Sequence, residues 1–437
     1  MEPRGEHLVR ADRAFATGGG LFARLTAPAF SRVLDQFHQR LASGGIEGIL
    51  PDGSPRRIGF HAPGPTAVVR LNSWMALVRV TTSGSVGLYK AWALGEWSSP
   101  DPVALFHLFS ANTLALGGTA RAKGPFRWMN ALAHRLRDNA PERARRNIAA
   151  HYDLGNDFYA AWLDPTMTYS SALFTQRVLS SDRATAGQTP FDFAQDERGG
   201  ESLEHAQLGK IHALLDRLNL KPGDRLLEIG CGWGTLAIEA AKRGVQVVGL
   251  TLSTEQKAWA DRKIADAGFS NRIEIRLQDY RETDEKFEAV ASVEMVEAVG
   301  QRWWGAYLDC VARNLKPGGR AALQFIYIRP ELFDRYAASA DFIQTYIFPG
   351  GMLLSEPLFA NMAKERGLSL LDRNGFAGDY AETLKRWRAN YEHALKGGQL
   401  AGFSKEFHNL WRYYLMYCEG GFRGGAIGVA QVTIVKS

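Results

Sequence analysis

The stretch LLEIGCGWG, from Leu226 to Gly234, decides the fold. An apolar run ends at the acidic Glu228, and glycines follow at alternate positions, Gly230, Gly232 and Gly234. A buried strand that leads into a glycine-rich turn and then a helix is typical of a parallel sheet, where glycine lets the backbone approach a ligand closely. The stretch therefore predicts a ligand-binding loop at the carboxyl end of a strand.

The residues that follow alternate between strand and helix patterns. Strands are predicted in the runs DRLLEIG, VQVVGLT, RIEIRLQD, FEAVASVE and RAALQFIYI. Helical segments separate them, and the amphipathic helix LEHAQLGKIHALLDRLNL comes before the first. Such alternation is the signature of a doubly wound, mostly parallel sheet, so the predicted fold class is α/β.

The composition indicates a globular protein of more than one domain. The chain has 437 residues, of which 46% are hydrophobic, and one core usually stops growing near ~250–300 residues. Lys and Arg number 52 against 46 Asp and Glu, a net charge of +6. This mild excess suits an anionic partner such as phosphate or a lipid surface, but it is too sparse for a dedicated nucleic-acid binder.

The cysteines and the apolar runs indicate the cellular compartment of the protein. Cys231, Cys310 and Cys418 have no pairing rhythm and no CxxC spacing, which predicts a reducing compartment and no metal site. No run approaches the ~18 consecutive apolar residues of a membrane span. The first residues lack the apolar core of a signal peptide. We therefore expect a cytoplasmic protein that can associate with a surface.

The N-terminal part is predicted to be a small α+β domain over residues 1–120. The runs TAVVRLN (Thr66–Asn72) and ALVRVTT (Ala76–Thr82) are rich in β-branched residues, which is typical of strands. The glycine-rich SGSVG after them predicts a turn.

A basic linker is predicted between the two domains, over residues 121–150. Within it, residues 121–146 are predicted to form a helix that is either solvated or placed at an interface with anionic lipid headgroups. The remaining residues, 151–437, are predicted to form the catalytic domain. Within it the polar stretch 180–202 breaks every periodicity, which predicts a mobile surface insertion.

Two ligand classes compete for the glycine loop. A dinucleotide fingerprint has the spacing G-x-G-x-x-G and an acidic residue ~20 positions further on. Here the spacing is G-x-G-x-G, and the end of the second strand is GLTLSTEQ, which has no carboxylate at the expected place. The acid comes before the glycines, as Glu228, and a carboxylate there favours a cation. The cationic sulfonium S-adenosylmethionine is the predicted ligand, with NAD as the less favoured alternative.

Long ordered motifs resemble one family. HYDLGNDFYAAWLDPTMTYSSALF, the segment from LEHAQLG to LTLSTEQ, SVEMVEAVG and YIFPGG are similar to the cyclopropane-fatty-acyl-phospholipid synthase family, from about His151 to the C-terminus. GLYKAWALGEWSSPDPVALF resembles the accessory domain of its two-domain members. The resemblance implies a seven-stranded Rossmann-like methyltransferase sheet, methylation of the double bond of an unsaturated phospholipid acyl chain, peripheral association with the inner face of a membrane, and a homodimer.

The resemblance also assigns the cofactor site. Tyr169 and Ser170 are expected near the methionine end of S-adenosylmethionine, and Gln278 and Asp279 near the adenine. Ser253 additionally reads as a helix N-cap, with Gln256 closing a capping box. The full predicted cofactor set is Tyr169, Ser170, Glu228, Gly230, Gly232, Gly234, Thr251, Ser253, Gln256, Gln278 and Asp279.

A bound bicarbonate is implied as the general base that takes a proton from a carbocation. Its predicted ligands are Glu297, Tyr380, Ser171, Gln324 and the backbone of Ile326. Two of these depart from the family, which has Cys where this chain has Ser171 and His where it has Gln324. Gln can donate a hydrogen bond but carries neither a proton nor a charge at neutral pH. We therefore expect weaker electrostatic support for the anion.

The sequence leaves the product open. The expected product is a cyclopropane ring, and the alternative is a methylene or methyl branch. Another acceptor remains possible because a fold fixes no function. A non-catalytic lipid-binding protein with a decayed site is the alternative of a different class, and the intact glycine loop with Glu297 and Tyr380 argues against it.

Overall fold

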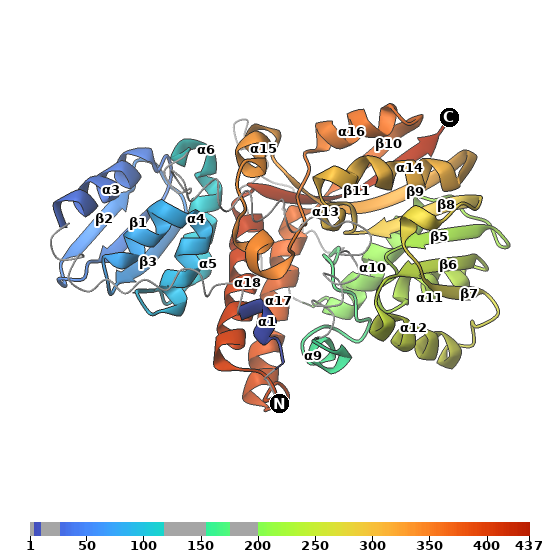
Figure 1. Cartoon of the computed structure of the whole chain (residues 1–437), viewed down its shortest axis with the longest axis horizontal. Helices are drawn as coiled ribbons and strands as arrows, with labels where there is room; N and C mark the ends of the chain where they lie inside the picture. The colour runs from blue at the N-terminus through green and yellow to red at the C-terminus, as the bar shows by residue number, and fades with distance from the viewer. Residues whose placement is uncertain (1–3, 10–26, 118–153, 175–199) are drawn as a thin grey trace. The chain divides into compact units, whose positions relative to one another are not determined.

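The structure, a computed structural model, describes residues 4–9, 27–117, 154–174 and 200–437. The predicted basic helix at 121–146 lies outside these residues, as does nearly all of the predicted insertion at 180–202. The chain divides into two compact units (Figure 1). The first unit comprises Met1–Arg137, Glu331–Pro349 and Ala401–Ile427, and the second comprises Asp138–Pro330, Gly350–Leu400 and Gly428–Ser437. The segments Glu331–Pro349 and Ala401–Ile427, assigned from sequence to the catalytic domain, thus group with N-terminal residues.

The first unit holds a four-stranded sheet in the order β2-β1-β3-β4. Its strands are β1 (Gly45–Ile49), β2 (Pro55–Gly59), β3 (Thr66–Leu71) and β4 (Trp97–Ser98). Its helical elements are α1 (Glu6–Val9), α3 (Ala27–Arg40), α4 (Met75–Ala93), α5 (Pro102–Ala111), α6 (Thr113–Leu116), η4 (Ile343–Ile347) and α18 (Lys405–Arg423), and α15 (Pro330–Ala337) begins at the boundary. The predicted strand Thr66–Asn72 is confirmed as β3.

The predicted strand Ala76–Thr82 is wrong, because these residues form the first part of α4. Buried Ala76, Leu77 and Val80 follow a helical spacing that the β-branched composition obscured. The hydroxyls of Thr81 and Thr82 donate to carbonyls four residues earlier, each at 2.8 Å, so they are satisfied within the helix. The predicted glycine turn is a kink inside α4 at Gly84, with φ 58°. Tertiary burial has overridden a weak local propensity.

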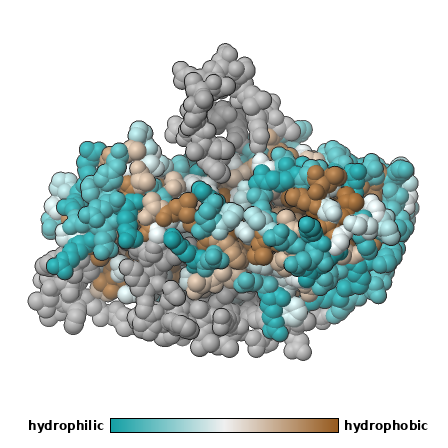
Figure 2. All heavy atoms as spheres, turned by 90° about the horizontal axis from the view of Figure 1, so that it is seen from above, coloured by the Kyte–Doolittle hydropathy of each residue, from teal (hydrophilic) through white to brown (hydrophobic). Residues whose placement is uncertain are grey.

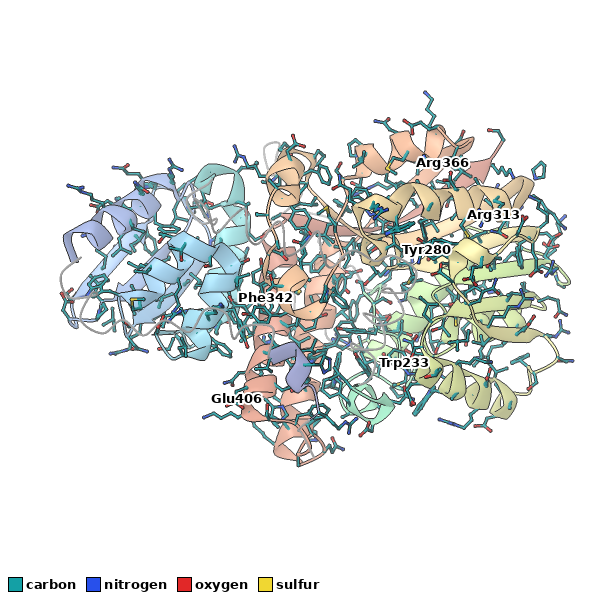
Figure 3. The ribbon with its side chains drawn as sticks, in the orientation of Figure 1. Trp233, Tyr280, Arg313, Phe342, Arg366 and Glu406 are labelled. Atoms are coloured by element: carbon teal, nitrogen blue, oxygen red, sulfur yellow. The ribbon has the colours of Figure 1, made fainter. Side chains whose placement is uncertain are left out.

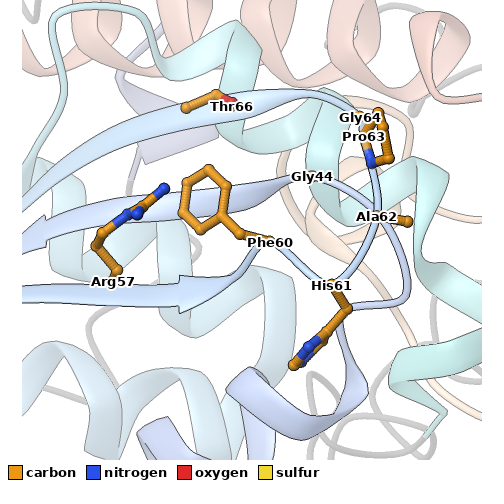
Figure 4. A pocket seen from close by; sticks show the side chains of 8 residues that line it. All are labelled: Gly44, Arg57, Phe60, His61, Ala62, Pro63, Gly64 and Thr66. Carbon is orange, nitrogen blue, oxygen red and sulfur yellow. The ribbon is translucent and has the colours of Figure 1, made fainter.

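One depression of the surface belongs to the first unit (Figure 4). It measures about 520 Å³ and is lined by Gly44, Arg57, Phe60, His61, Ala62, Pro63, Gly64 and Thr66. The Arg57 guanidinium lies 4.3 Å from the centroid of the Phe60 ring. No residue of the predicted site lines this depression.

The second unit is built on a seven-stranded sheet in the order β10-β11-β9-β8-β5-β6-β7. The strands are β5 (Arg225–Ile229), β6 (Gln246–Thr251), β7 (Ile273–Leu277), β8 (Phe287–Val293), β9 (Leu315–Ile328), β10 (Leu368–Gly375) and β11 (Ile427–Lys436). Pairs from β7 through β6, β5 and β8 to β9 are parallel, and β10 is antiparallel to β11. The predicted α/β class and mostly parallel sheet are confirmed.

Helices precede and connect these strands, as the alternating pattern predicts (Figure 1). They are α9 (Asn156–Ala160), α10 (Leu203–Asp216), α11 (Thr235–Lys242), α12 (Thr254–Asp266), α13 (Val296–Val299), α14 (Trp304–Asn314), α16 (Glu356–Lys364) and α17 (Ala377–Lys396), with the short η2 (Tyr280–Glu282) and η3 (Gln301–Trp303). An apolar core that includes Leu214, Leu226 and Ala289 is fully buried beside the sheet.

The strand order determines where a ligand can bind. After β5 the chain adds β6 and β7 on one side, and it then returns to add β8 and β9 on the other. In such sheets the ligand crevice lies beyond the carboxyl ends of the strands at this reversal. The reversal falls between β5, which ends at Ile229, and β8, which ends at Val293.

The apolar character of the surface and of the helices bears on contact with a membrane. Figure 2 shows a face on which most of the coloured residues are hydrophilic, with smaller hydrophobic areas among them. Leu370 and Leu371 of β10 are among the exposed large apolar side chains, at 48% and 55% exposure. Within the described ranges, no helix has both the length and the apolar character that crossing a membrane requires.

Candidate active site

The glycine loop after β5 is tight at one position and open at another. Gly230, Gly232 and Gly234 have φ values of 82°, 51° and 86°, a region that favours glycine. A Cβ added to Gly230 would lie 2.5 Å from Sδ of Met295. A Cβ added to Gly232 would meet nothing within 4 Å. The backbone at Gly232 can therefore be approached closely by a ligand.

Glu228, two residues before the loop, is a buried carboxyl group on β5. It is 4% exposed, and burial raises its pKa well above the ordinary value while the charge of Lys210 lowers it. Its Oε2 atom accepts no hydrogen bond from any described residue. A buried acceptor with free capacity beside a glycine loop fits a ligand that offers N–H donors or a positive charge, and S-adenosylmethionine offers both.

Thr251, Ser253 and Gln256 form one connected turn at the end of β6. Oγ of Ser253 accepts from the backbone N–H of Gln256 at 3.2 Å, so Ser253 is the N-cap of α12, as predicted. The capping box does not form, because Ser253 N–H donates to Oγ1 of Thr251 and the Thr251 hydroxyl donates to Oε1 of Gln256. All three side chains are buried, which holds the turn rigid next to the glycine loop.

Gln278 and Asp279 follow β7 on the same sheet edge. Gln278 N–H donates to the Thr251 carbonyl at 3.1 Å, which joins this turn to the previous one. The buried Asp279 carboxylate is bound by the Arg281 guanidinium, with Nη2 at 2.6 Å from Oδ2. Its oxygens therefore serve mainly to position Arg281, whose guanidinium lies 4.6 Å from the ring centroid of Trp303.

An aromatic cluster surrounds the half-buried Tyr169. Its ring centroid lies 5.4 to 5.5 Å from those of Tyr159, Trp162 and Trp387. Trp233 lies in the glycine loop (Figure 3). Its ring packs 5.2 Å from that of Tyr159, and its indole N–H donates to Asn156 at the start of α9. Aromatic faces stabilise nearby positive charge, so this cluster suits a cationic ligand. None of these tryptophans is among the residues predicted from the sequence.

Lys210 on α10 is a further residue that sequence reasoning missed. Its side chain is fully buried, and Nζ donates to Oγ of Ser170 at 2.6 Å. Burial lowers the pKa of Lys210 to about 8, although Glu294, Asp164 and Glu228 act to raise it. The sequence does contain a signal for this residue. Lys210 and Gln207 lie on the buried face of a predicted amphipathic helix, and polar residues at core positions are unusual unless functional.

A second polar group gathers at the carboxyl end of β8, around Glu294. Oε1 of this glutamate accepts from the Ser171 backbone N–H and from Nε2 of Gln324, each at 2.9 Å. Its Oε2 accepts from the Tyr380 hydroxyl at 2.7 Å. Three of the residues predicted as bicarbonate ligands thus converge on one side chain that the sequence analysis did not single out. The Ser171 hydroxyl takes no part, since it donates to the Ala172 carbonyl.

The orientation of the Gln324 amide is fixed by a hydrogen bond that its oxygen accepts. Nε2 of Gln431, on β11, donates to Oε1 of Gln324 at 3.1 Å. Oε1 of Gln431 in turn accepts from Nε of Arg217 at 3.3 Å. Because the Gln324 oxygen already accepts, its NH₂ group faces Glu294. Gln324 therefore serves as a neutral donor to a carboxylate.

Glu297, predicted to hold the anion, lies one turn further on in α13. Its Oε1 accepts from the backbone N–H of Ile326 at 3.0 Å, and Oε2 accepts from no described residue. Burial raises the pKa of Glu297 well above its ordinary value, and the nearby charge of Glu294 raises it further. The pKa of Glu294 is also raised by burial, but the Tyr380 and Ser171 donors and Lys210 oppose that rise. Glu294 therefore has more contacts that favour its ionised form than Glu297 has.

These contacts do not fit a bicarbonate held as the resemblance implies. The Gln324 amide and the Tyr380 hydroxyl already bind the Glu294 carboxylate, the Ser171 hydroxyl already binds the Ala172 carbonyl, and the Ile326 N–H already binds Glu297. Ser171, Gln324 and Tyr380 are thus brought together, but around a carboxylate of the chain itself.

The sheet order, the glycine loop and the buried acid at the end of β5 define the fold of an S-adenosylmethionine-dependent methyltransferase. Residues 139–432 match the family described as mycolic acid cyclopropane synthetase. The chain belongs to this family, and it is an S-adenosylmethionine-dependent methyltransferase.

Relatives in this family extend over most of the chain. Tuberculostearic acid methyltransferase UfaA1 of Mycobacterium tuberculosis is 36% identical over 391 residues, which are 88% of this chain and 82% of that protein. Cyclopropane-fatty-acyl-phospholipid synthase of Escherichia coli is 32% identical over 364 residues, 82% of this chain and 85% of the relative.

A solved structure supports the cofactor assignment. Mycolic acid cyclopropane synthase CmaA1, in complex with S-adenosylhomocysteine (SAH) and CTAB, is 32% identical and superposes with a TM-score of 0.58, covering 67% of this chain and 98% of that one. The similarity to cyclopropane synthases expected from the sequence motifs is confirmed.

Proposed function

We propose that the protein transfers the methyl group of S-adenosylmethionine to the double bond of an unsaturated acyl chain in a phospholipid. The observation that carries the proposal is the pairing of two sites at neighbouring strand ends. An open glycine loop with the buried Glu228 lies after β5, and a half-buried carboxylate held by three donors lies after β8. The names of the relatives, which act on fatty acyl chains, support the same substrate class.

The chemistry requires both sites. An alkene is a weak nucleophile, and bound S-adenosylmethionine would supply an electrophilic methyl group for it to attack. Attack leaves a carbocation in the chain, which must be shielded from water and must then lose a proton. The cluster around Tyr169 and Trp387 supplies aromatic faces for the cation. A base within the polar group after β8 accepts the proton.

Two products are compatible with this reaction. Direct loss of a proton from the added methyl group closes a cyclopropane ring. Loss of that proton after a hydride shift along the chain gives a methylene branch. The relative that is 36% identical over 88% of the chain is named for a methyl-branched acid, and this favours the branch. Bicarbonate has no part in the proposed reaction, because its expected ligands already bind Glu294 and Glu297.

Membrane association and a homodimer are part of the same proposal. A phospholipid acyl chain is available only at a bilayer surface, so the enzyme must bind there. The basic segment 121–146, outside the described residues, carries charges suited to anionic headgroups.

A comparison of acyl carriers tests the substrate. We expect methylation of oleoyl chains supplied as phospholipid vesicles and none when the same chain is supplied as free oleate or oleoyl-CoA. Vesicles of saturated phospholipid are the matched control, because they bind the same surface without offering a double bond. Hydrogenation of the product under mild conditions then separates a methylene branch, which takes up hydrogen, from a ring, which does not. Preferred methylation of the free acid would contradict the phospholipid substrate.

A further inference from the structure

The Glu294 carboxylate occupies a built anion site. Ser171 N–H, the Gln324 amide and the Tyr380 hydroxyl reach it from three different segments of the second unit, at 2.9, 2.9 and 2.7 Å. A carboxylate offers about four lone-pair positions. Two contacts fall on Oε1 and one on Oε2, so among the described residues one position on Oε2 stays free to accept a proton.

The backbone at Glu294 is also unusual. Its φ is 53°, in the left-handed region that non-glycine residues seldom adopt. Glu294 N–H donates to the Gln324 carbonyl at 2.7 Å, so the strained conformation is held by the same residue that binds the side chain. Strain of this kind concentrates at functional sites, and here it coincides with the convergence of donors on the carboxylate.

Glu294 also adjoins the cofactor loop. Its neighbour Met295 packs against Gly230 so closely that a Cβ there would lie 2.5 Å from its side chain. Ser171, which donates to Glu294, directly follows Tyr169 and Ser170, expected near the methionine end of the cofactor. Lys210 bonds Ser170 and acts electrostatically on both Glu228 and Glu294. The carboxylate therefore lies beside the predicted position of the reactive methyl group.

We propose that Glu294 is the general base of the methyl transfer, built into the chain at the position where the family resemblance places a bicarbonate. The reaction in this inference rests on the proposed function, whereas the site rests on the hydrogen bonds to Glu294. It assigns Gln324 and Tyr380 as positioning residues, which hold the carboxylate through its two oxygens.

The step balances without a further reactant. The alkene π electrons form the bond to the methyl carbon, while the carbon–sulfur bond breaks and leaves its electron pair on sulfur. Oε2 of Glu294 then takes a proton from the added methyl group, and the electron pair of that C–H bond closes the ring or, after the hydride shift, forms the exocyclic double bond. The carboxylic acid that results returns its proton to solvent before the next turnover.

Anion binding tests the inference independently of turnover. We titrate ¹³C-labelled bicarbonate into the full-length protein with S-adenosylhomocysteine present, and follow it by calorimetry and ¹³C NMR. The wild-type protein should bind no bicarbonate, whereas Glu294→Gly should bind it in the space that the side chain leaves. Glycine suits this position because it adopts a positive φ without strain. Saturable binding of bicarbonate to the wild-type protein would overturn the proposal.

Turnover supplies the second readout. Wild-type activity on monounsaturated vesicles should be the same in bicarbonate-depleted and bicarbonate-supplemented buffer. Glu294→Gln should lose at least ~100-fold in kcat, the scale of a positioned general base, with S-adenosylhomocysteine affinity changed less than ~3-fold. Glu294→Gly should show the same loss and regain activity with added bicarbonate or formate. Glu239→Gln removes a buried carboxyl bonded to His212 and Lys242 and is the control, with activity unchanged.

The outcomes separate this inference from the proposed function. In one outcome the wild-type protein methylates no acyl chain, and bicarbonate binds to Glu294→Gly but not to the wild-type protein. The assignment of the anion site to Glu294 is then retained, and the proposed acyl substrate is wrong. If the wild-type protein is active and Glu294→Gln retains most of its kcat, or if depletion of bicarbonate abolishes wild-type activity, Glu294 is not the base.

Discussion

Replacement of Lys210 by methionine is expected to lower the free energy of unfolding by about 3–5 kcal/mol, the usual cost of removing one partner of a buried ionic group. The Lys210 side chain is fully buried, and its positive charge offsets the carboxyl groups of the buried Glu228 and Asp164 and of the half-buried Glu294. Methionine fills a similar volume but leaves these groups without a neutralising charge. It also leaves the Ser170 hydroxyl without the donor that now lies at 2.6 Å.

Urea unfolding of the full chain, followed by tryptophan fluorescence, measures this effect. Lys242→Met is the matched control: that lysine bonds Glu239 at 2.6 Å but has a side chain that is 55% exposed. Because the lysine end of this pair reaches solvent, we expect it to contribute ~1 kcal/mol or less, so the control should change little. A Lys210→Met midpoint equal to that of the control would show that the buried charge is dispensable.

Replacement of Gly232 by alanine is expected to weaken the binding of S-adenosylhomocysteine by ~10–100-fold. An added methyl group meets no protein atom within 4 Å, so it intrudes only on the space assigned to the ligand. A steric conflict of ~1–3 kcal/mol is typical of one extra methyl in a filled site, and each ~1.4 kcal/mol is a factor of ten in the dissociation constant.

Gly223→Ala is the control for this change. Gly223 lies in the turn before β5 with φ 93°, and an added Cβ there also meets nothing within 4 Å. Both variants carry the strain of alanine at positive φ, but only Gly232 lies in the loop. Isothermal titration should therefore show unchanged affinity for Gly223→Ala. Equal loss in both variants would mean that backbone strain, and not contact with the ligand, causes the effect.

The parallel part of the sheet could be predicted because each strand is a short apolar run bounded by turn residues. The apolar runs of β5 to β9 differ clearly from the helical patterns between them. The ligand class of the glycine loop was predicted from the position of Glu228 and the spacing of the glycines. The segment Ala76–Thr82 could not be predicted in this way. Its β-branched residues favour a strand locally, and only packing in the folded unit makes them helical.

That the loops after β5, β6 and β7 share one edge of the sheet could be predicted, because successive parallel strands end there. The proposed base, Glu294, could not be predicted in this way. SVEMVEAVG contains two glutamates, and the resemblance directs attention to Glu297 rather than Glu294. Nothing in the sequence reports that Glu294 has a left-handed backbone or that three segments donate to its side chain. Buried polar pairs such as Gln324 with Gln431 depend on strands β9 and β11, which are distant in sequence.

The central claim, methyl transfer to an acyl double bond, is tested most directly by mass spectrometry of the lipid product. The purified protein is incubated with methyl-deuterated S-adenosylmethionine and vesicles of monounsaturated phospholipid, and the fatty acids are then released and analysed. The account predicts a fatty acid heavier by one carbon that retains two deuterium atoms, because one is lost to the base. An unchanged fatty acid from protein that binds S-adenosylhomocysteine would contradict the claim.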